Sequence, residues 1–335
     1  MDLDLYGEMH LAPTDSFMIK TTPFSSLISS CSNHPITIVT NFVALLSIVM
    51  ILTLSNFILQ PSFSEIISYG NNGTARSSCN CVAFRMDGIQ DYWVRAGQLA
   101  AMNQFIFRNQ SVTLGMIMGG LAEDTEIINK IKQGTDSGLF ELATHGWNFS
   151  EFTRLSEEEQ RNSLDNSNKK MIEMFGNASD IFAPPYEAFN DETINAMKQV
   201  NMKILSGNRS SFDRLQLNGN NPESSTPLSS SDQSEYISYI PATVPFKTYS
   251  GGQYIQNSLE SIFNNATQSI DAYGYAVIVI DPQHFMQVDE TGTPTDTVDQ
   301  NSINELSRLL HFLSLNNIRI GSFAEIPAEM ENKDI

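Results

Sequence analysis

The chain has 335 residues, which is enough for one large domain with additional segments. Hydrophobic residues make up 41% of the chain, and this composition indicates neither a fibrous nor a fully disordered protein. The formal net charge of −19 argues against nucleic acids and anionic membrane surfaces as partners, because both require a basic protein face.

The first predicted element is a membrane-spanning helix over residues 36–59. These residues include no charged side chain. At about 1.5 Å per residue, a helix of this length spans about 36 Å, which is enough for the hydrocarbon core of a bilayer. A secretory signal has a shorter apolar core followed by a cleavage site between small residues, and no such site follows here. We therefore expect a retained single-pass anchor.

The segments beside this anchor favour an external location for the rest of the chain. Residues 1–35 form a tail with one lysine among several carboxylates, so charge alone does not orient the helix. Residues 60–78 are predicted to be a polar tether. Glycosylation sequons follow the anchor and none precedes it, which favours a cytoplasmic tail and a C-terminal domain outside the cell. The sequons begin at Asn72, Asn109, Asn148, Asn177, Asn208 and Asn265.

Cys79 and Cys81 form a C-x-C pair at the start of the first predicted strand. The chain has only three cysteines, too few for a disulfide framework. A metal site is disfavoured, because no second Cys/His pair at zinc-finger spacing accompanies this one. A local disulfide is a second interpretation, and two unpaired cysteines are the leading one.

From residue 79 the chain alternates between apolar strand patterns and helical patterns. Such alternation predicts a parallel sheet, and a length of roughly 250 residues favours closure into a β/α barrel over two small domains. Ser156 with Glu159 predicts a capping box, and Asn190 predicts a second helix cap. Residues 207–235 are rich in Ser, Asn and Pro and are predicted to be a loop insertion. The predicted strands cover 81–86, 111–118, 139–144, 180–183, 202–206, 236–241, 274–281 and 317–323.

Polar residues follow several of these strands. Asp87, His145, Ser206 and Asp281 each come at a strand end, and Ala183-Pro184-Pro185-Tyr186 ends another strand. In a β/α barrel the carboxyl ends of the strands meet at one edge, which we call the mouth. The sequence therefore predicts that these residues converge on one site.

Residues 79–327 resemble the polysaccharide deacetylase family, the NodB-homology domains of carbohydrate esterase family four. The resemblance is carried by the order and spacing of the stretches VAFRMDGIQDYW, LFELATHGWNFSEFTRLSEEE, IFAPPYEAFNDETINAM, YIPATVPF, VIVIDPQHF and IRIGSFAEIP. It implies a distorted (β/α) barrel of about seven repeats, with residues 328–335 as a short tail. It also implies hydrolysis of acetyl groups, mostly N-acetyl, on polysaccharides with one divalent metal, most often zinc.

The family's metal is held by one aspartate and two histidines, and this sequence departs from that pattern. A second family aspartate acts as general base, whereas here only Asp87 is present. Either Asp87 takes the base position and Gly88 replaces the metal ligand, or Asp87 is the ligand and Met86 replaces the base. The match continues through Ile89, Gln90 and Asp91, which favours the first register.

The other two motifs also differ from the family. His145 matches the first metal histidine, but Phe149 stands where the second is expected. The last motif contains Asp281 and His284 in exchanged order relative to the family's acid histidine and aspartate. Ala183 replaces an arginine of many members. Losing two of three ligands should remove most of the zinc affinity.

A rearranged site is still conceivable from these residues. Its members would be Asp87 and Asp281 as catalytic groups, His145, Asp91 and His284 as metal ligands, and Trp147, Pro185 and Tyr186 as substrate-binding residues. Each polar member has a plainer interpretation. Asp91 suits the first turn of a helix, His284 suits an exposed loop, Asp281 suits a turn before proline, and His145 suits packing.

Two hypotheses about function therefore remain. The first is a membrane-anchored hydrolase of carbon–nitrogen bonds in acetylated surface glycans, with altered zinc ligation. The second is a descendant without activity or cofactor that binds glycan or a partner protein at the mouth. The replaced ligands make hydrolysis the less favoured of the two.

Overall fold

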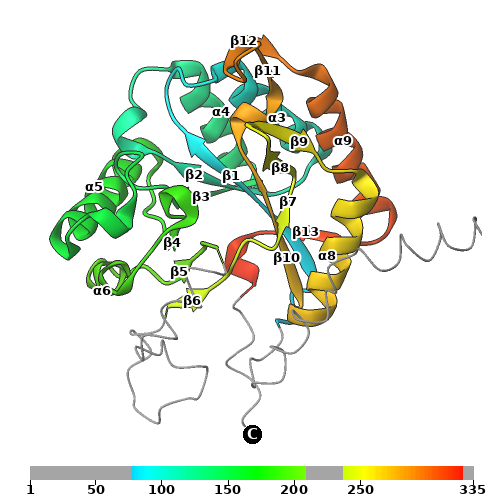
Figure 1. Ribbon diagram of the computed structural model, residues 1–335. Helices are drawn as coiled ribbons and strands as arrows, with labels where there is room; N and C mark the ends of the chain where they lie inside the picture. Colours follow the sequence, from blue (N-terminus) through cyan, green and yellow to red (C-terminus); the bar gives the residue numbers. More distant parts are fainter. Residues whose placement is uncertain (1–76, 209–236, 327–335) are drawn as a thin grey trace, which may run out of the picture. The chain divides into compact units, whose positions relative to one another are not determined.

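The computed structural model describes residues 77–208 and 237–326 (Figure 1). The chain divides into two units, Met1–Phe63 and Ser64–Ile335, and the described residues all belong to the second. The predicted anchor over 36–59, the tails and nearly all of the predicted insertion lie outside the described residues. Within the described ranges, no helix is both long and apolar enough to cross a membrane.

A parallel sheet forms the centre of the second unit (Figure 1). Strand β1 (Cys81–Ile89) lies in the middle and pairs with β2, β10 and β13. The remaining order is β6-β5-β4-β3-β2-β1-β10-β7, and every pairing along it is parallel. The other strands are β2 (Val112–Met116), β3 (Phe140–Thr144), β4 (Ile181–Phe182), β5 (Ile204–Leu205), β6 (Ser238–Tyr239), β7 (Val244–Pro245), β10 (Tyr275–Ile280) and β13 (Arg319–Gly321).

This sheet curls but does not close in the part of the chain that the structure describes. Its path ends at β6 on one side and β7 on the other, with no pairing between these two strands. The predicted α/β class with a parallel sheet is confirmed. The predicted closure into a barrel is not seen among the described strands, which form a half-barrel with helices around it.

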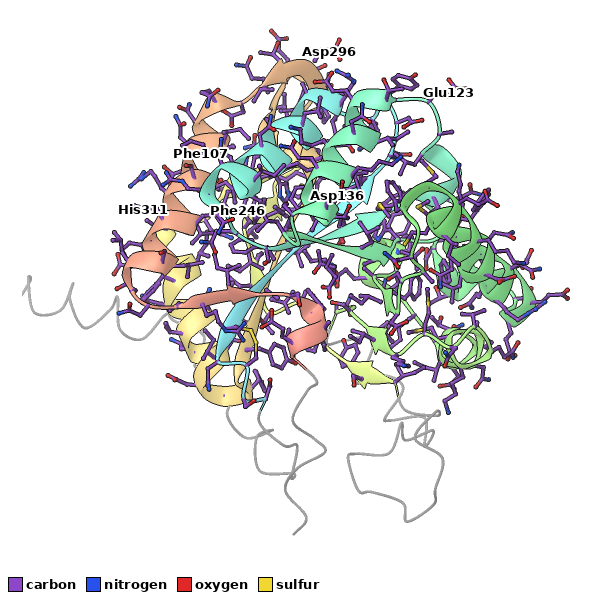
Figure 2. All side chains as sticks on the ribbon, turned by 180° about the vertical axis from the view of Figure 1, so that it is seen from behind. Phe107, Glu123, Asp136, Phe246, Asp296 and His311 are labelled. Carbon is purple, nitrogen blue, oxygen red and sulfur yellow. A yellow bond between two sulfur atoms is a disulfide. The ribbon has the colours of Figure 1, made fainter. Side chains whose placement is uncertain are left out.

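Helices cover the outside of the sheet, and α3, α4 and α9 form a layer that is visible from behind (Figure 2). The predicted caps at Ser156 and Asn190 are confirmed, each with a capping box. Short 3₁₀ helices follow several strands: η2 (Met118–Gly120), η3 (Phe152–Arg154), η4 (Pro185–Glu187), η6 (Pro282–Phe285) and η7 (Phe323–Glu325). The helices are α3 (Arg95–Arg108), α4 (Thr125–Asp136), α5 (Glu157–Phe175), α6 (Asp191–Gln199), α8 (Leu259–Tyr273) and α9 (Gln300–Leu315).

Side-chain alternation along β1 determines what each face of the sheet contains. Val82, Phe84 and Met86 belong to the large apolar core that includes residues of α3, α4, α8 and α9. Cys81 and Ala83 belong to a smaller core that also contains Phe323 of η7. Because side chains alternate along a strand, Arg85 and Asp87 share the face of Cys81 and Ala83. The inner face is therefore apolar near the start of β1 and ionic near its end.

Two hairpins lie outside the main sheet. One pairs β8 (Lys247–Ser250) with β9 (Gln253–Gln256), and the other pairs β11 (Met286–Val288) with β12 (Pro294–Val298). Gly251 and Gly252 have φ of 61° and 87°, values that glycine adopts without strain, and they make the tight turn between β8 and β9. The hairpin thus follows β7 directly and leads into α8.

Candidate functional site

The inner face of β1 ends in a buried ion cluster centred on Arg85. Its side chain is fully buried, and its Nε donates to both carboxylate oxygens of Asp87 at 2.9 Å. Nη2 donates to Asp87 Oδ2 at 2.7 Å and also to Glu187 Oε1. Nη1 donates to the backbone oxygen and hydroxyl of Ser206, at 2.9 and 2.6 Å. We call Arg85, Asp87, Glu187 and Ser206 the Arg85 cluster.

Local backbone features bring the cluster together. A side chain at Gly115 of β2 would place its Cβ 2.6 Å from Asp87 Oδ1, so glycine there makes room for the carboxylate. Tyr186 and Glu187 in η4 both have left-handed backbones, with φ of 59° and 57°. This conformation is costly for residues other than glycine. In η4 these two residues form a turn. The Tyr186 side chain is exposed on this turn, and the Glu187 carboxylate contacts Arg85.

The charges of the cluster stabilise one another. Burial by itself would lower the pKa of Arg85, but the carboxylates of Asp87 and Glu187 outweigh it and raise the pKa. Burial raises the pKa of Glu187, Arg85 opposes this rise, and Asp87 adds to it. The guanidinium is therefore the fixed cation between two carboxylates.

Asp281 lies beside this cluster at the end of β10. Ile280 pairs with Met86 across the two central strands, so the next residue, Asp281, follows the strand at the level of Asp87. About a third of its side chain is exposed (32%). Burial and the charge of Asp87 raise the pKa of Asp281 to about 7. Its carboxyl group thus exchanges a proton near neutral pH.

His284 lies in η6 behind Asp281 and is 3% exposed, so its interpretation as a solvent-facing loop residue is wrong. Its Nδ1 accepts the backbone N–H of Asp281 at 3.1 Å, which places the proton of the neutral ring on Nε2. Nε2 lies 3.4 Å from Asp281 Oδ2. Burial and the charge of Lys247 lower the pKa of His284 to about 3, so the ring is neutral at physiological pH.

His145 follows β3 and is also buried. Its Nδ1 donates to the backbone oxygen of Ala183 at 2.7 Å. Burial lowers the pKa of His145, Asp87 opposes this effect, and Arg85 reinforces it. The ring lies 5.5 Å from that of Phe149, centroid to centroid. His145 is thus a neutral ring held in the mouth beneath an aromatic side chain.

Phe149 and Tyr186 form an exposed aromatic pair beside the Arg85 cluster. Their ring centroids are 4.8 Å apart, and half or more of each side chain is exposed. The other two predicted substrate-binding residues are less accessible. Pro185 is buried, and Trp147 is half-buried with Lys170 Nζ 5.4 Å from its ring centroid. Of the three, Tyr186 offers a free ring surface.

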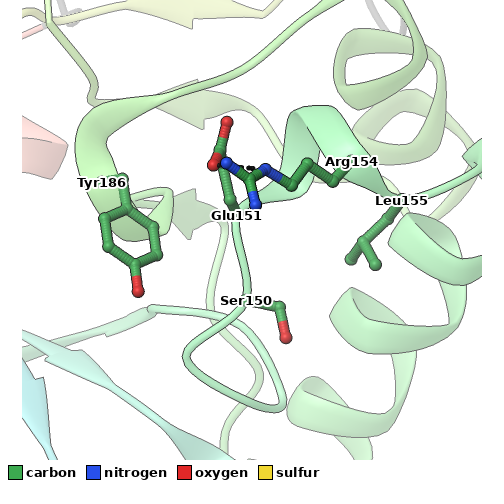
Figure 3. A pocket seen from close by; sticks show the side chains of 5 residues that line it. All are labelled: Ser150, Glu151, Arg154, Leu155 and Tyr186. Carbon is green, nitrogen blue, oxygen red and sulfur yellow. Dashed lines mark ion pairs between the residues drawn. The ribbon is translucent and has the colours of Figure 1, made fainter.

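A hollow of about 430 Å³ adjoins Tyr186 (Figure 3). Ser150, Glu151, Arg154 and Leu155 line the rest of it. Arg154 Nε pairs with Glu151 Oε2 at 2.8 Å, and Arg154 is largely exposed. The hollow therefore combines one aromatic ring with hydrogen-bonding groups that solvent can reach.

Asp91 lies in the loop between β1 and α3. Its Oδ2 accepts the backbone N–H groups of Ala122 and Glu123 at 2.6 and 2.5 Å, which ties this loop to the turn after η2. The interpretation of Asp91 as a residue in the first turn of a helix is wrong, because Tyr92 and Val94 have left-handed backbones and α3 begins at Arg95. Asp91 consequently holds two loops together.

These placements do not form the predicted metal site. Across residues 77–208 and 237–326, no group of three or more His, Cys, Asp or Glu side chains is arranged to hold a metal ion. Asp87 is engaged by Arg85, Gly88 has no side chain, and Phe149 has no donor atom. The donor set around His145 therefore does not fit the metal that the resemblance implies, and Asp91 and His284 do not complete it.

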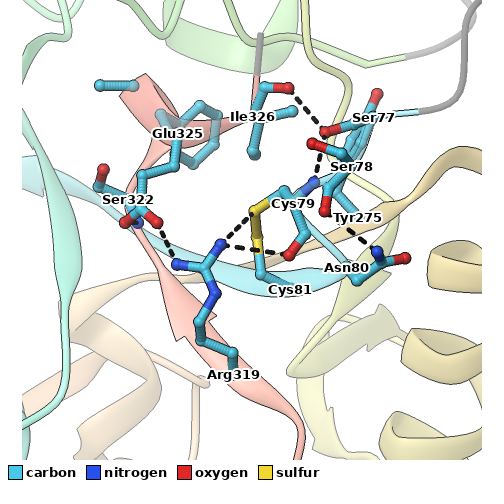
Figure 4. The surroundings of a disulfide bond; sticks show 12 residues. Ser77, Ser78, Cys79, Asn80, Cys81, Tyr275, Arg319, Ser322, Glu325 and Ile326 are labelled. Atoms are coloured by element: carbon cyan, nitrogen blue, oxygen red, sulfur yellow. Dashed lines mark hydrogen bonds and ion pairs between the residues drawn. A yellow bond between two sulfur atoms is a disulfide. The ribbon is translucent and has the colours of Figure 1, made fainter. Parts of the chain in front are cut away.

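The cysteine pair lies at the opposite end of β1 and is disulfide-bonded (Figure 4). The leading interpretation of two unpaired cysteines is therefore wrong. Asn80 between them has φ of 44°, a left-handed conformation that asparagine tolerates and that turns the chain back on itself. Arg319 donates to Cys79 Sγ and to its backbone oxygen, both at 3.2 Å, and pairs with Glu325. The pair is a structural element at the amino-terminal end of β1.

Sequence reasoning missed two members of the Arg85 cluster. Arg85 and Glu187 were not singled out as site residues. The available signal was a charged residue inside an otherwise apolar strand pattern, since a buried arginine requires partners. No local signal marks Glu187, because its approach depends on the left-handed turn of η4.

Residues 109–205 match the family model described as polysaccharide deacetylase. The chain resembles this family. The matched segment runs from the start of β2 to β5 and contains His145 and Glu187, whereas Asp87 and Asp281 lie outside it. No curated protein matches the chain.

Solved structures of similar fold share little sequence with this polysaccharide deacetylase-like chain. The Xyl-CE4 domain of a multidomain xylanase from the hindgut metagenome of Trinervitermes trinervoides is 14% identical, with a TM-score of 0.44 over 73% of this chain and 88% of that one. A family 4 acetyl xylan esterase from Clostridium thermocellum, in complex with a cobalt ion, is 15% identical, with a TM-score of 0.45 over 73% and 89%. A CE4 family pseudoenzyme from Bacillus anthracis is 14% identical, with a TM-score of 0.45 over 76% and 67%.

We predict that Arg85→Met lowers the free energy of unfolding by about 3–5 kcal/mol, because it leaves the carboxylates of Asp87 and Glu187 buried without their cation. Urea denaturation followed by circular dichroism measures the change. The matched control is Arg154→Met, which removes an arginine that is 80% exposed and should cost less than about 1 kcal/mol. Equal losses in both variants would contradict the central role of Arg85.

We predict that Asp281 contributes stability that is present at about pH 4 and is lost as pH rises to about 7. Its folded-state pKa of about 7 exceeds the ordinary value of 3.8, so only the folded state retains the proton in this window. Asp281→Asn should remove this contribution, on the order of 1 kcal/mol after allowing for solvent screening. Denaturation at several pH values measures it, with the exposed Asp180→Asn as control. Parallel pH profiles for wild type and Asp281→Asn would refute the assignment.

Proposed function

We propose that this deacetylase-like domain binds acetylated polysaccharide at the mouth and does not hydrolyse it through a bound metal. The observation that carries the proposal is the Arg85 cluster. A fully buried guanidinium occupies both oxygens of Asp87 and reaches Glu187, so these two carboxylates already have their cation. A binding function uses the groups that remain accessible.

The accessible groups suit a sugar. Phe149 and Tyr186 present exposed rings, and apolar ring faces stack against the C–H faces of sugars. The hollow beside Tyr186 adds the guanidinium of Arg154, the carboxylate of Glu151 and the hydroxyl of Ser150, which can exchange hydrogen bonds with sugar hydroxyls. The net charge of −19 disfavours an anionic glycan.

A second candidate is hydrolysis without a metal, and Asp281 is the observation in its favour. A carboxyl group with a pKa of about 7 is suited to general acid–base catalysis near neutral pH. Its location next to Asp87 would put two carboxyl groups at one site. Release of acetate from the polysaccharide separates this candidate from binding alone.

The test is titration calorimetry of the full-length chain with N-acetylglucosamine hexasaccharide, with and without a metal chelator. We expect binding that the chelator does not weaken and no release of acetate. Tyr186→Ala should lower the affinity about fivefold, because one stacked ring contributes on the order of 1 kcal/mol.

The matched control for Tyr186→Ala is Phe107→Ala, which removes an exposed ring from α3, away from the mouth. The control should bind like the wild type. Absence of binding, or binding lost with the chelator, would refute the proposal. Acetate release that Asp281→Asn abolishes would support the second candidate.

The proposal extends to location: the domain lies outside the cytosol, attached by the predicted anchor over residues 36–59. The Cys79–Cys81 disulfide supports this location, because disulfides persist in oxidising compartments and are rare in the cytosol. Exposed sequons at Asn109, Asn148 and Asn177 are compatible with it.

We predict that Cys79 and Cys81 resist alkylation in protein taken from its native membrane under acid quench, and react after reduction. Mass spectrometry of the peptide containing both residues measures this. A Cys31→Ser variant serves as control, since it removes the third thiol and leaves the pair. Two alkylated cysteines before reduction would contradict the external location.

A further inference from the structure

We infer that the β8–β9 hairpin forms a second sugar-binding wall of the mouth, so that the site takes an extended polysaccharide chain and not a single sugar unit. The inference rests on the proposed function. It adds that the bound ligand is an extended chain and that it contacts the β8–β9 hairpin. Its central residues are Tyr249 and Tyr254, which face each other across the two strands. We call them the hairpin pair.

The hairpin pair has the features of a sugar platform. The two rings are edge-to-face with centroids 5.1 Å apart, and Tyr249 is 64% and Tyr254 40% exposed. Neither strand of the hairpin pairs with the main sheet. Its exposed aromatic surface is therefore not part of the core and is free to contact a ligand.

The hairpin pair is continuous with the carboxylates of the mouth. The Tyr254 ring lies 4.6 Å from that of His284, and its hydroxyl accepts a hydrogen bond from Gln283 at 3.1 Å. Both contacts are to η6, which begins directly after Asp281. The charge of Asp281 contributes, after burial, to a raised pKa of Tyr254, which agrees with this proximity.

Sheet order places the two aromatic pairs on opposite sides of Arg85. Phe149 follows β3 and Tyr186 follows β4, whereas the hairpin follows β7, the strand beyond β10. Because the sheet curls, Glu187 next to Tyr186 reaches Arg85 of β1, the strand that lies between β4 and β10 in the sheet order. A ligand that touches both pairs must therefore reach across Arg85.

The chemistry of the hairpin favours an uncharged ligand. Residues 248–256 contain no charged side chain and supply hydroxyl and amide groups around the two rings. Lys247, the first residue of β8, donates to Ser302 and lies 4.0 Å from Asp299, so the protein supplies a hydrogen-bond partner and a counter-charge for it. Rings surrounded by neutral hydrogen-bonding groups match a neutral polyhydroxyl chain better than a charged one.

Binding of N-acetylglucosamine oligomers of two lengths, a disaccharide and a hexasaccharide, to the full-length chain tests the inference. We expect Tyr254→Ala to lower the affinity for the hexasaccharide about tenfold and to leave the affinity for the disaccharide unchanged. Tyr186→Ala should lower both. Tyr254→Phe keeps the ring and should bind the hexasaccharide like the wild type.

The matched control is Ile255→Ala on the same strand, because its side chain points to the other face of the hairpin. It should bind both ligands normally, and its melting temperature shows whether the hairpin tolerates substitution. A wild-type affinity of Tyr254→Ala for the hexasaccharide, with Tyr186→Ala impaired, would overturn the inference and leave the proposed function intact. Equal impairment of both lengths by Tyr254→Ala would also overturn it. Failure of the wild type to bind either length would instead overturn the proposed function.

Discussion

The buried guanidinium of Arg85 is the interaction on which the candidate site depends. Moving such an ion out of water costs several kcal/mol, and close partners with good geometry are needed to offset this cost. Here its donors reach Asp87 on β1, Ser206 after β5, and Glu187 in η4. One side chain thus connects the central strand to segments more than a hundred residues away, and the loops after β4 and β5 are held in position by the same contacts that stabilise the charge.

This arrangement changes what the mouth can do. In the family that the chain resembles, carboxylate and imidazole groups converge on a metal, whereas here the cation belongs to the protein. Arg85 holds Asp87, the side chain is absent at Gly88, and His145 lies beneath Phe149. Arg85 and Asp87 are buried and bonded to each other, and His145 Nδ1 donates to Ala183, while the rings of Phe149 and Tyr186 are exposed. A surface of this kind favours recognition of a ligand over polarisation of its carbonyl group.

The sequence predicted the parts of this structure that depend on local pattern. The alternation of strand and helix patterns predicted the parallel sheet. Because the carboxyl ends of parallel strands meet at one edge, it also predicted that Asp87, His145 and Asp281 converge there. The ion pair between Arg85 and Glu187 was out of reach, because it joins residues 102 positions apart through a turn with two left-handed residues. The Cys79–Cys81 disulfide depends likewise on the left-handed backbone of Asn80.

The open form of the sheet connects these observations to ligand length. A closed ring of strands would surround its mouth on all sides, but here β6 and β7 are not paired in the described part of the chain. The segment after β7 is consequently free to form a hairpin outside the sheet, and Tyr254 of this hairpin contacts η6. Aromatic surfaces therefore flank Arg85 from both directions of the sheet. A polysaccharide chain that contacts both surfaces reaches across Arg85, whose own donors are already taken by the protein.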